Sequence, residues 1–433
     1  MLRPGPGHSP ELVAQNQRER LLAAAVVAIA ERGYEQTPVA ELLKLSGISR
    51  TTFYQHFPGG KEECFLAAVD AAFATGLDAV EEACEGDGDW DAQMERAFEA
   101  LALAIVDQPA AARIALVEVY AAGPTGLAHA DEGLSRFAWS LTEALGRSPE
   151  RAAVPPAIAS GLAGGIRKVL ESRVATGQAA TLPELMPALR EWALAYRNPP
   201  QPIRRPRTRP PLNSVSRFVV HDQVDRIFGA VAATVAEKGY PAMTLDDIVK
   251  SAGASLTTFY QHFDGKEQAF LAAYDSAMAQ AEAAALPPLR WSRSWPQGVR
   301  AALEAYLSFW AAEPQWARIA MVDVLTAGQP GLEHRDRSLG VFEEILRPGA
   351  TLAPEASPLA VEAIGGAVHA LIYEQIQRRG AEHLLQILPA VTFVALTPFT
   401  GPQEAIAVAN KGALRSRSPS AKRASRTRGS RHG

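Results

Sequence analysis

The side chains best suited to a chemical task lie in one eleven-residue segment, Gly-Ile-Ser-Arg-Thr-Thr-Phe-Tyr-Gln-His-Phe at residues 47–57. Phe53 and Phe57 are four residues apart and can anchor one side of a helix in a core. Hydroxyl, amide and guanidinium groups are then left on the other side. Such groups on a helix that fits a DNA major groove can contact base edges and hold phosphates. The segment therefore predicts a nucleic-acid-binding helix.

The same segment occurs twice in the chain. Residues 253–263 match residues 47–57 at nine of eleven positions, with an offset of 206. Further matches continue at an offset of 205, for example Gly-Leu-Ala-His at 126–129 and Gly-Leu-Glu-His at 331–334. A fixed offset over this length indicates a tandem duplication of a unit of about 200 residues.

Hydrophobic periodicity places the segment in a helix-turn-helix. Leu21, Ala25 and Ile29 fall on one face of a helix, and the second copy repeats this pattern. Two short helices follow, separated by a turn. Gly47 and Gly253 stand at the turn, where the backbone needs a residue that tolerates a positive φ.

Helix caps are also expected from the sequence. Ser49 and Ser255 are placed to cap the second short helix of each copy. In the second copy Thr244 and Asp247 have the spacing of a capping box for the first short helix. In the first copy Thr37 is the expected cap, with the following proline at the first helical position.

These features resemble the N-terminal domain of the tetracycline-repressor (TetR) family of bacterial transcription regulators. The resemblance covers about 50 residues per copy and includes the Gly-Lys-Glu that follows the segment in both copies. It implies an all-α protein that binds double-stranded DNA and an unidentified small-molecule effector. Family members are ordinarily single units that dimerise, so the duplication implies an intramolecular pseudo-dimer and leaves open a further homodimer.

The resemblance also implies which residues contact DNA. Arg50, Leu256 and the paired threonines would face bases, and the tyrosines, histidines and lysines would contact the phosphate backbone. The expected DNA-binding residues are Ser49, Arg50, Thr51, Thr52, Tyr54, Gln55, His56 and Lys61 in the first copy, and Thr244, Ser255, Leu256, Thr257, Thr258, Tyr260, Gln261, His262 and Lys266 in the second.

The chain is expected to divide into seven segments. Prolines and arginines alternate from Asn198 to Ser216, which favours a semi-rigid extended spacer. The expected segments are a disordered N-terminus (1–17), a first helix-turn-helix domain (18–62), a first helical effector and dimerisation domain (63–197), the linker (198–217), a second helix-turn-helix domain (218–267), a second helical domain (268–400) and a basic disordered tail (401–433).

Charge is distributed unevenly along the chain. The net charge is −4, yet residues 193–221 hold six arginines and no acid, and the residues after Glu404 hold eight basic residues and no acid. The remaining residues are strongly acidic, so the protein must present cations locally to bind a polyanion. Two cysteines fit a reducing cytosol, and the first apolar run is too short to span a bilayer. A cytoplasmic protein without a membrane partner is expected.

No other residues predict a chemical activity. Spacings typical of metal ligands, nucleophile elbows and phosphate loops are missing from the sequence, so no enzyme, metal or cofactor is expected. Large aromatic residues in the helical domains are candidates for an effector pocket, although such residues more often belong to the core. The candidates are Tyr120, Phe137, Trp139, Phe309, Trp310 and Phe342.

The sequence thus predicts an all-α tandem TetR-like regulator. Its simplest role is that of an effector-responsive repressor on a pseudo-palindromic operator. Glycines in residues 157–176 and 359–379 would let helices of the two copies approach closely and form a bundle within one chain. The alternative is a helical interaction scaffold whose basic linker and tail bind nucleic acid without sequence preference.

Overall fold

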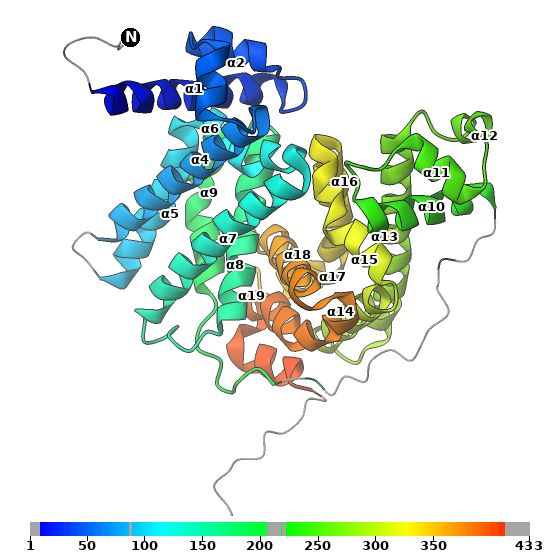
Figure 1. The fold of residues 1–433 in the computed structure, drawn as a ribbon. Coiled ribbons are helices and arrows are strands. Elements are labelled where there is room, and N and C mark those ends of the chain that lie inside the picture. The colour runs from blue at the N-terminus through cyan, green and yellow to red at the C-terminus, as the bar shows by residue number, and fades with distance from the viewer. Residues whose placement is uncertain (1–8, 86–88, 205, 207–217, 219–221, 412–433) are drawn as a thin grey trace, which may run out of the picture.

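The computed structural model describes residues 9–85, 89–204, 206, 218 and 222–411. Within these residues the regular structure is helical and contains no strand, which confirms the predicted all-α class. The two copies form two lobes that meet along a central group of helices (Figure 1). The helix-turn-helix segments lie at the outer ends of the two lobes, at the upper left and the right of the view.

The helices of the first unit, together with two short 3₁₀ helices, occupy most of its described residues. They are α1 (Pro10–Arg32), α2 (Val39–Ser46), α3 (Arg50–His56), α4 (Lys61–Cys84), α5 (Trp90–Asp107), α6 (Pro109–Leu116), η1 (Glu118–Ala122), α7 (Gly123–Gly146), α8 (Pro156–Ala175), η2 (Ala179–Thr181) and α9 (Leu182–Leu194).

The second unit follows the same order. Its elements are α10 (Gln223–Lys238), α11 (Leu245–Ala252), α12 (Leu256–Tyr260), α13 (Lys266–Trp291), α14 (Trp295–Ala312), α15 (Pro314–Met321), η3 (Asp323–Ala327), α16 (Gly328–Ser338), α17 (Gly340–Leu352), α18 (Ala360–Arg379), η4 (Ala381–Ile387) and α19 (Leu388–Ala409).

The duplication extends to helix boundaries and to individual ion pairs. The bounds of α14 and α15 lie 205 residues after those of α5 and α6. His129 contacts Asp70 at 2.6 Å, and at the same offset His334 contacts Asp275 at 2.8 Å. The units differ at α7. The first unit forms this one continuous helix, whereas the second unit forms two helices, α16 and α17, at the equivalent positions.

Glycines bring α8 and α18 together across the boundary between the two units. A Cβ atom at Gly164 would lie less than 3.0 Å from the Cβ of Ala370, and one at Gly366 less than 3.0 Å from the Cβ of Lys168. Real Cβ atoms do not approach so closely, so only glycine fits at these two positions. The expected close approach of the two glycine-rich helices is confirmed.

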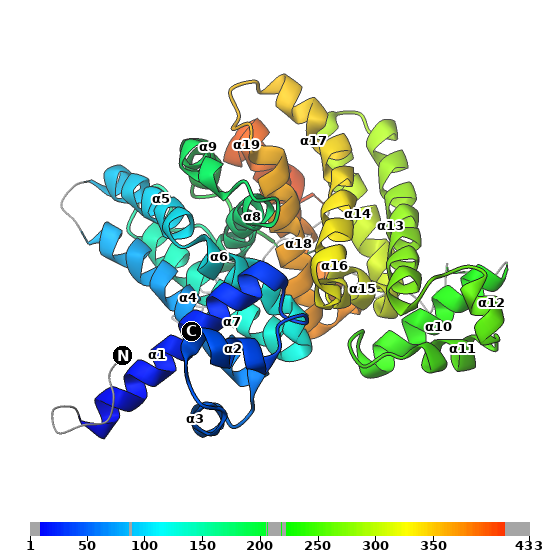
Figure 2. The ribbon, with the colours of Figure 1, turned by 90° about the horizontal axis from the view of Figure 1, so that it is seen from above.

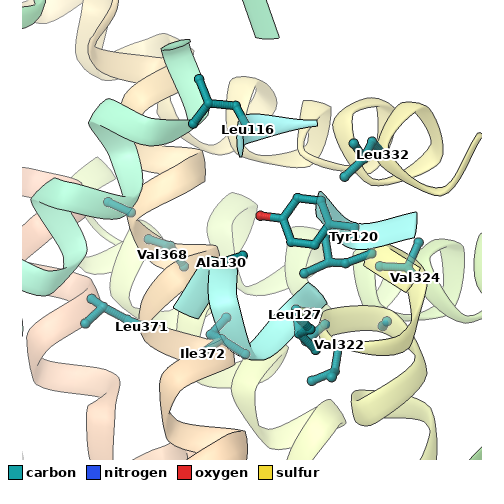
Figure 3. Packing of buried hydrophobic residues seen from close by; sticks show 14 of the residues in the cluster. Leu116, Tyr120, Leu127, Ala130, Val322, Val324, Leu332, Val368, Leu371 and Ile372 are labelled. Carbon is teal, nitrogen blue, oxygen red and sulfur yellow. The ribbon is translucent and has the colours of Figure 1, made fainter. Parts of the chain in front are cut away.

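Apolar side chains from both units form one continuous core. Tyr120 and Leu127 of the first unit lie near Val322 and Val324 of the second (Figure 3). Polar contacts add to this packing: Arg173 donates two hydrogen bonds of 2.8 Å to Glu362. In Figure 2 the paired helices α8 and α18 lie between the lobes.

The predicted disorder at the ends of the chain is wrong for residues 10–17 and 401–409. The α1 helix begins at Pro10 because the Ser9 side chain accepts a hydrogen bond from the backbone N–H of Leu12 and proline suits the first helical position. At the other end, α19 continues to Ala409 across a bend at Gly401, where φ is 74°. Residues 1–8 and 412–433 lie outside the described residues.

The start of the predicted linker is hydrogen-bonded to the helical units. The Asn198 side chain donates to the carbonyl oxygen of Pro149 at 2.8 Å. The Asn410 side chain accepts from the backbone N–H of Arg204 at 2.8 Å and donates to the carbonyl oxygen of Pro202 at 3.1 Å. The first residues of the linker therefore lie against the end of α19. Most of the later linker residues lie outside the described part.

One segment, Ala381–Ala409, is long and apolar enough to cross a membrane, with a mean hydropathy of 1.6. In the structure 61% of its most apolar stretch is buried among other helices. The core helix of a protein without a membrane partner meets the same criteria of length and composition.

Candidate nucleic-acid interface

The first helix-turn-helix consists of α2, a glycine turn and α3. Gly47 is left-handed, with φ 63° and ψ 28°, and ends α2. The Ser49 hydroxyl accepts a hydrogen bond of 3.1 Å from the backbone N–H of Thr52 and caps α3. Both predictions for this turn are confirmed.

The second helix-turn-helix has the same construction in α11 and α12. Gly253 has φ 60° and ψ 32°, and the Ser255 hydroxyl accepts from the backbone N–H of Thr258 at 3.1 Å. Thr244 and Asp247 form the predicted capping box, with reciprocal hydrogen bonds of 3.2 and 3.0 Å. The Thr244 hydroxyl also donates to the Asp247 carboxylate at 2.7 Å.

The predicted cap of the first short helix in copy one is wrong. Pro38 is the residue before α2, and it has no side-chain hydrogen bond to offer. Thr37 is instead fully buried, and its hydroxyl donates to the carbonyl oxygen of Gly33 at 2.8 Å. Because α2 begins one residue later than expected, this hydroxyl points away from α2 and toward the end of α1. There it bonds to a carbonyl group that has no partner within the helix.

Phenylalanines anchor both recognition helices, as the four-residue spacing predicts. Phe53, Phe57 and Phe259 are fully buried, and Phe263 is nearly so. The neighbouring tyrosines point outward: Tyr54 is 44% exposed and Tyr260 is 56% exposed. Because the aromatic side is held in the core, the opposite side of each helix faces solvent.

The exposed side of α3 carries the polar residues that the sequence singled out. Arg50, Thr51 and Gln55 are exposed beside Tyr54, and Ser49 is exposed at the N-terminus. Thr52 is half-buried, and its hydroxyl lies 2.9 Å from the Ser49 hydroxyl. Arg50 is therefore free of the core and can reach a groove, but its contact with bases stays a prediction.

The equivalent side of α12 is less polar at its first residue. Leu256 is 46% exposed. Thr257, Gln261 and His262 are exposed as well. The Thr258 hydroxyl lies 2.8 Å from the Ser255 hydroxyl, as in the first unit.

The two lysines expected at phosphates have other contacts in this structure. Lys61 Nζ donates to the carbonyl oxygen of Tyr34 at 2.8 Å and lies 4.2 Å from the centre of the Tyr34 ring. Lys266 Nζ donates to the carbonyl oxygen of Met243 at 3.0 Å. Burial lowers the pKa of Lys61, and Glu35 partly offsets this. Each lysine thus ties the start of α4 or α13 to the turn before the first short helix.

His56 also has a partner that the sequence analysis missed. Its Nε2 lies 3.2 Å from Oε1 of Gln17, and Arg18 lies over the Phe57 ring at 4.8 Å. Both partners belong to the first turns of α1, where disorder was predicted in part. The Ser-Pro pair at residues 9–10 is the signal that could have revealed this earlier helix start.

The comparisons with known proteins agree with this geometry. A family model described as "Bacterial regulatory proteins, tetR family" matches residues 21–68 and 227–273, which span α1 to α4 and α10 to α13 in part. The chain belongs to the TetR family. It carries the family's N-terminal domain twice.

Curated TetR relatives match parts of this chain. An uncharacterized HTH-type transcriptional regulator of Mycobacterium tuberculosis is 40% identical over 58 residues, which are 13% of this chain and 30% of that protein. The HTH-type transcriptional activator FasR of Mycolicibacterium smegmatis is 26% identical over 149 residues, 33% of this chain and 68% of that protein. The chain spans less than a third of the first curated relatives it matches.

Solved structures match one unit at a time. A TetR-like transcriptional regulator from Rhodococcus sp. RHA1 is 20% identical, with a TM-score of 0.35, and the match covers 41% of this chain and 96% of that one. FadR from Bacillus subtilis, solved with stearoyl-CoA, is 17% identical with a TM-score of 0.34, over 41% of this chain and 97% of that one.

The two TetR units differ at the N-terminus of the helix that follows the recognition helix. In the first unit the Glu63 carboxylate accepts from the backbone N–H of Gly59 at 2.7 Å. In the second unit the Gln268 amide oxygen accepts from the backbone N–H of Asp264 at 2.6 Å. The turn carries one carboxylate in each unit, that of Glu63 in the first and that of Asp264 in the second, so the two sites do not differ in the sign of this charge.

The aromatic residues proposed for an effector pocket separate into two groups. Phe137 lines a cavity of about 120 Å³ and a neighbouring one of about 330 Å³, which Trp139 also lines. Tyr120 lines a third, of about 30 Å³. Phe309, Trp310 and Phe342 line none of these three cavities and are buried in the core of the second unit.

Proposed function

We propose that this chain is a DNA-binding transcription regulator, an effector-responsive repressor that binds the two halves of a pseudo-palindromic operator as a covalent pseudo-dimer. The observation that carries the proposal is the presence of two complete helix-turn-helix units, each with a capped recognition helix and an exposed polar side. As part of the same proposal it acts in the cytoplasm and is not an enzyme.

The contact between α8 and α18 supports the pseudo-dimer. In a regulator of this kind the two recognition helices must reach successive major grooves, about 34 Å apart. The buried boundary between the units restricts their relative movement. An effector that binds more tightly to a state in which the recognition helices are differently spaced lowers the affinity for DNA. The factor by which it does so cannot exceed the ratio of the effector's own affinities for the two states.

Selection of bound sequences from a random DNA pool tests the proposal, with the mass of the purified chain in solution measured alongside. We expect an imperfect palindrome bound by one chain. Affinity that does not depend on sequence would instead favour the alternative, a scaffold with non-specific nucleic-acid binding. Isolated halves should self-associate through the exposed faces of α8 and α18, and stable monomeric halves would count against the pseudo-dimer.

Substitution of Arg50 tests the recognition helices separately. Arginine pairs with guanine through two hydrogen bonds, whereas Leu256 offers only apolar contact, for example to a thymine methyl group. Arg50→Ala should cost about 1 to 3 kcal/mol of binding on one half-site. Leu256→Ala is the matched control, and its effect should be confined to the other half-site. Equal losses on both half-sites from either variant would contradict the assignment.

A further inference from the structure

The first unit contains an apolar cavity of about 120 Å³ among α4 to α8. Small and aliphatic side chains form most of its wall, including Gly76, Leu101, Ala104, Ile105 and Ala111. An apolar cavity of this size holds about one aromatic ring, since a cavity of roughly 150 Å³ in another protein binds benzene.

Larger side chains fill the same region of the second unit. At the offset of 205, three of the wall residues are replaced by rings: Leu101 by Tyr306, Ala104 by Phe309 and Ala111 by Trp316. Ile105 is likewise replaced by a tryptophan, Trp310. All four aromatic side chains are at most 6% exposed, and Phe309 packs edge-on against its tryptophan neighbour with ring centres 4.9 Å apart.

Arg167 is the charged residue in the wall of the first-unit cavity. It donates a hydrogen bond from Nη1 to the Tyr120 hydroxyl, and the same nitrogen lies 3.3 Å from the Glu171 carboxylate. Within the described part of the chain both contacts use Nη1. A guanidinium group has five N–H donors, so Nε and Nη2 are left to donate to a ligand.

Glu171 connects this arginine to the second unit. Its carboxylate is almost fully buried and forms an ion pair with Arg335 on α16. Arg335 also pairs with Asp336, whose carboxylate accepts from Lys168 of the first unit at 2.8 Å. The cavity wall is thereby joined to α16 by a chain of buried charges.

The second unit has no equivalent cation at the position of Arg167. Gly164 of α8 contacts Ala370 of α18, and Gly366 of α18 contacts Lys168 of α8. The two contacts are equivalent if each α8 residue corresponds to the α18 residue 202 positions later. Arg167 therefore corresponds to His369. This side chain is partly buried, and its buried Nε2 has no hydrogen-bond partner among the described residues. Burial, with Arg335 and Arg167 nearby, lowers its pKa to about 3, so the ring is neutral near pH 7.

The geometry points to two unequal units: a small apolar ligand with one hydrogen-bond acceptor for Arg167 binds in the first unit only, and the Glu171–Arg335 pair transmits its effect to the second. The ligand is about the size of one aromatic ring and carries a group such as a carbonyl. Its acceptor binds Nε or Nη2 and draws the guanidinium of Arg167 toward the cavity, away from Glu171, which pairs with Nη1. Any change in Glu171 then reaches α16 directly, because Arg335 is bound to the same carboxylate.

Calorimetric titration of the full chain with acetophenone tests the site, with ethylbenzene as the probe that lacks an acceptor. We expect one equivalent of acetophenone per chain, bound about tenfold more tightly than ethylbenzene, which corresponds to one hydrogen bond from a charged donor. Two equivalents per chain, no binding of either probe, or equal affinities would overturn the proposal.

Two variants on α5 locate the site. Ala104→Phe introduces the residue that the second unit has at this position, and it should reduce acetophenone affinity at least tenfold. Leu103→Phe is the matched control, because Leu103 is 44% exposed and does not line the cavity, so affinity should stay within twofold of the parent. Circular dichroism confirms that each variant is folded. Unchanged affinity in Ala104→Phe would place the site elsewhere and overturn the proposal.

Hydrogen exchange tests the connection between the units without DNA. At saturating acetophenone, amide exchange in α16 should change in the parent chain, and in Glu171→Gln this change should disappear even where calorimetry shows the site to be occupied. Arg335→Lys, which keeps the charge but loses the two-pronged pairing, is the second variant if Glu171→Gln fails to fold. A ligand effect on α16 that survives in a folded variant would refute the route. The regulatory role rests on the proposed function, but these measurements hold whether or not the chain proves to bind a specific operator.

Discussion

The contact between α8 and α18 can be tested by adding a single methyl group. A Cβ atom in Gly164→Ala would lie less than 3.0 Å from that of Ala370, so the two helices must separate or the side chains must strain. Overpacking of this kind costs about 1 to 3 kcal/mol. Alanine in a helix interior regains up to about 1 kcal/mol relative to glycine. The net expectation is a destabilisation of about 1 to 2 kcal/mol.

Gly229→Ala is the matched control, because Gly229 lies inside α10 and a Cβ there meets nothing within 4 Å. This variant should gain stability by about 0.5 to 1 kcal/mol. Gly164→Ala combined with Ala370→Gly should return to within about 0.5 kcal/mol of the parent, since the new methyl group then meets its nearest atom, the carbonyl oxygen of Gly366, at 3.4 Å. Urea denaturation of the four proteins provides the unfolding free energies. If both glycine variants gained stability equally, the close packing of α8 on α18 would be refuted.

Two further predictions concern stability. The pKa of His369 is about 3 in the folded chain, below its value near 6.5 in the unfolded chain. The stability that the neutral imidazole contributes is therefore complete above pH 6.5 and is lost as the pH falls toward 3. Between pH 7.5 and pH 5 the parent should lose about 2 kcal/mol more than His369→Leu in urea denaturation, and parallel losses would contradict this. Ser49→Ala and Ser255→Ala each remove an N-cap and should cost about 1 kcal/mol, measured by amide exchange in α3 and α12, whereas unchanged exchange would show that the caps carry no stability.

The helix-turn-helix could be predicted from the sequence because its determinants are local. A glycine that needs a positive φ, a serine two residues later and two phenylalanines four residues apart all act within eleven residues. Gly47, Ser49 and Phe53 consequently have the roles expected of them. Both copies show the pattern, so a chance match is a poor explanation of it.

Features that depend on distant partners could not be predicted in this way. The ammonium group of Lys61 bonds to the carbonyl oxygen of Tyr34, 27 residues away in the chain, and the His56 ring lies 3.2 Å from Gln17, 39 residues away. The aromatic candidates for a pocket depend on distant partners in the same way. Phe137 and Phe309 look alike as isolated residues, and only the packing around each decides which borders a cavity.

Covalent linkage of the two units explains how their boundary can be unequal. A symmetric homodimer places every residue of its interface twice, so a buried arginine on one side requires the same arginine and its counter-charge on the other. In one chain the two sides are encoded separately, and Arg167 can stand at the position that corresponds to His369. A second buried cation would need a second carboxylate to offset the free energy of its desolvation. A boundary with one buried row of charges therefore has a smaller desolvation penalty than a boundary with two. The same freedom lets one unit keep a cavity while aromatic rings fill the equivalent region of the other.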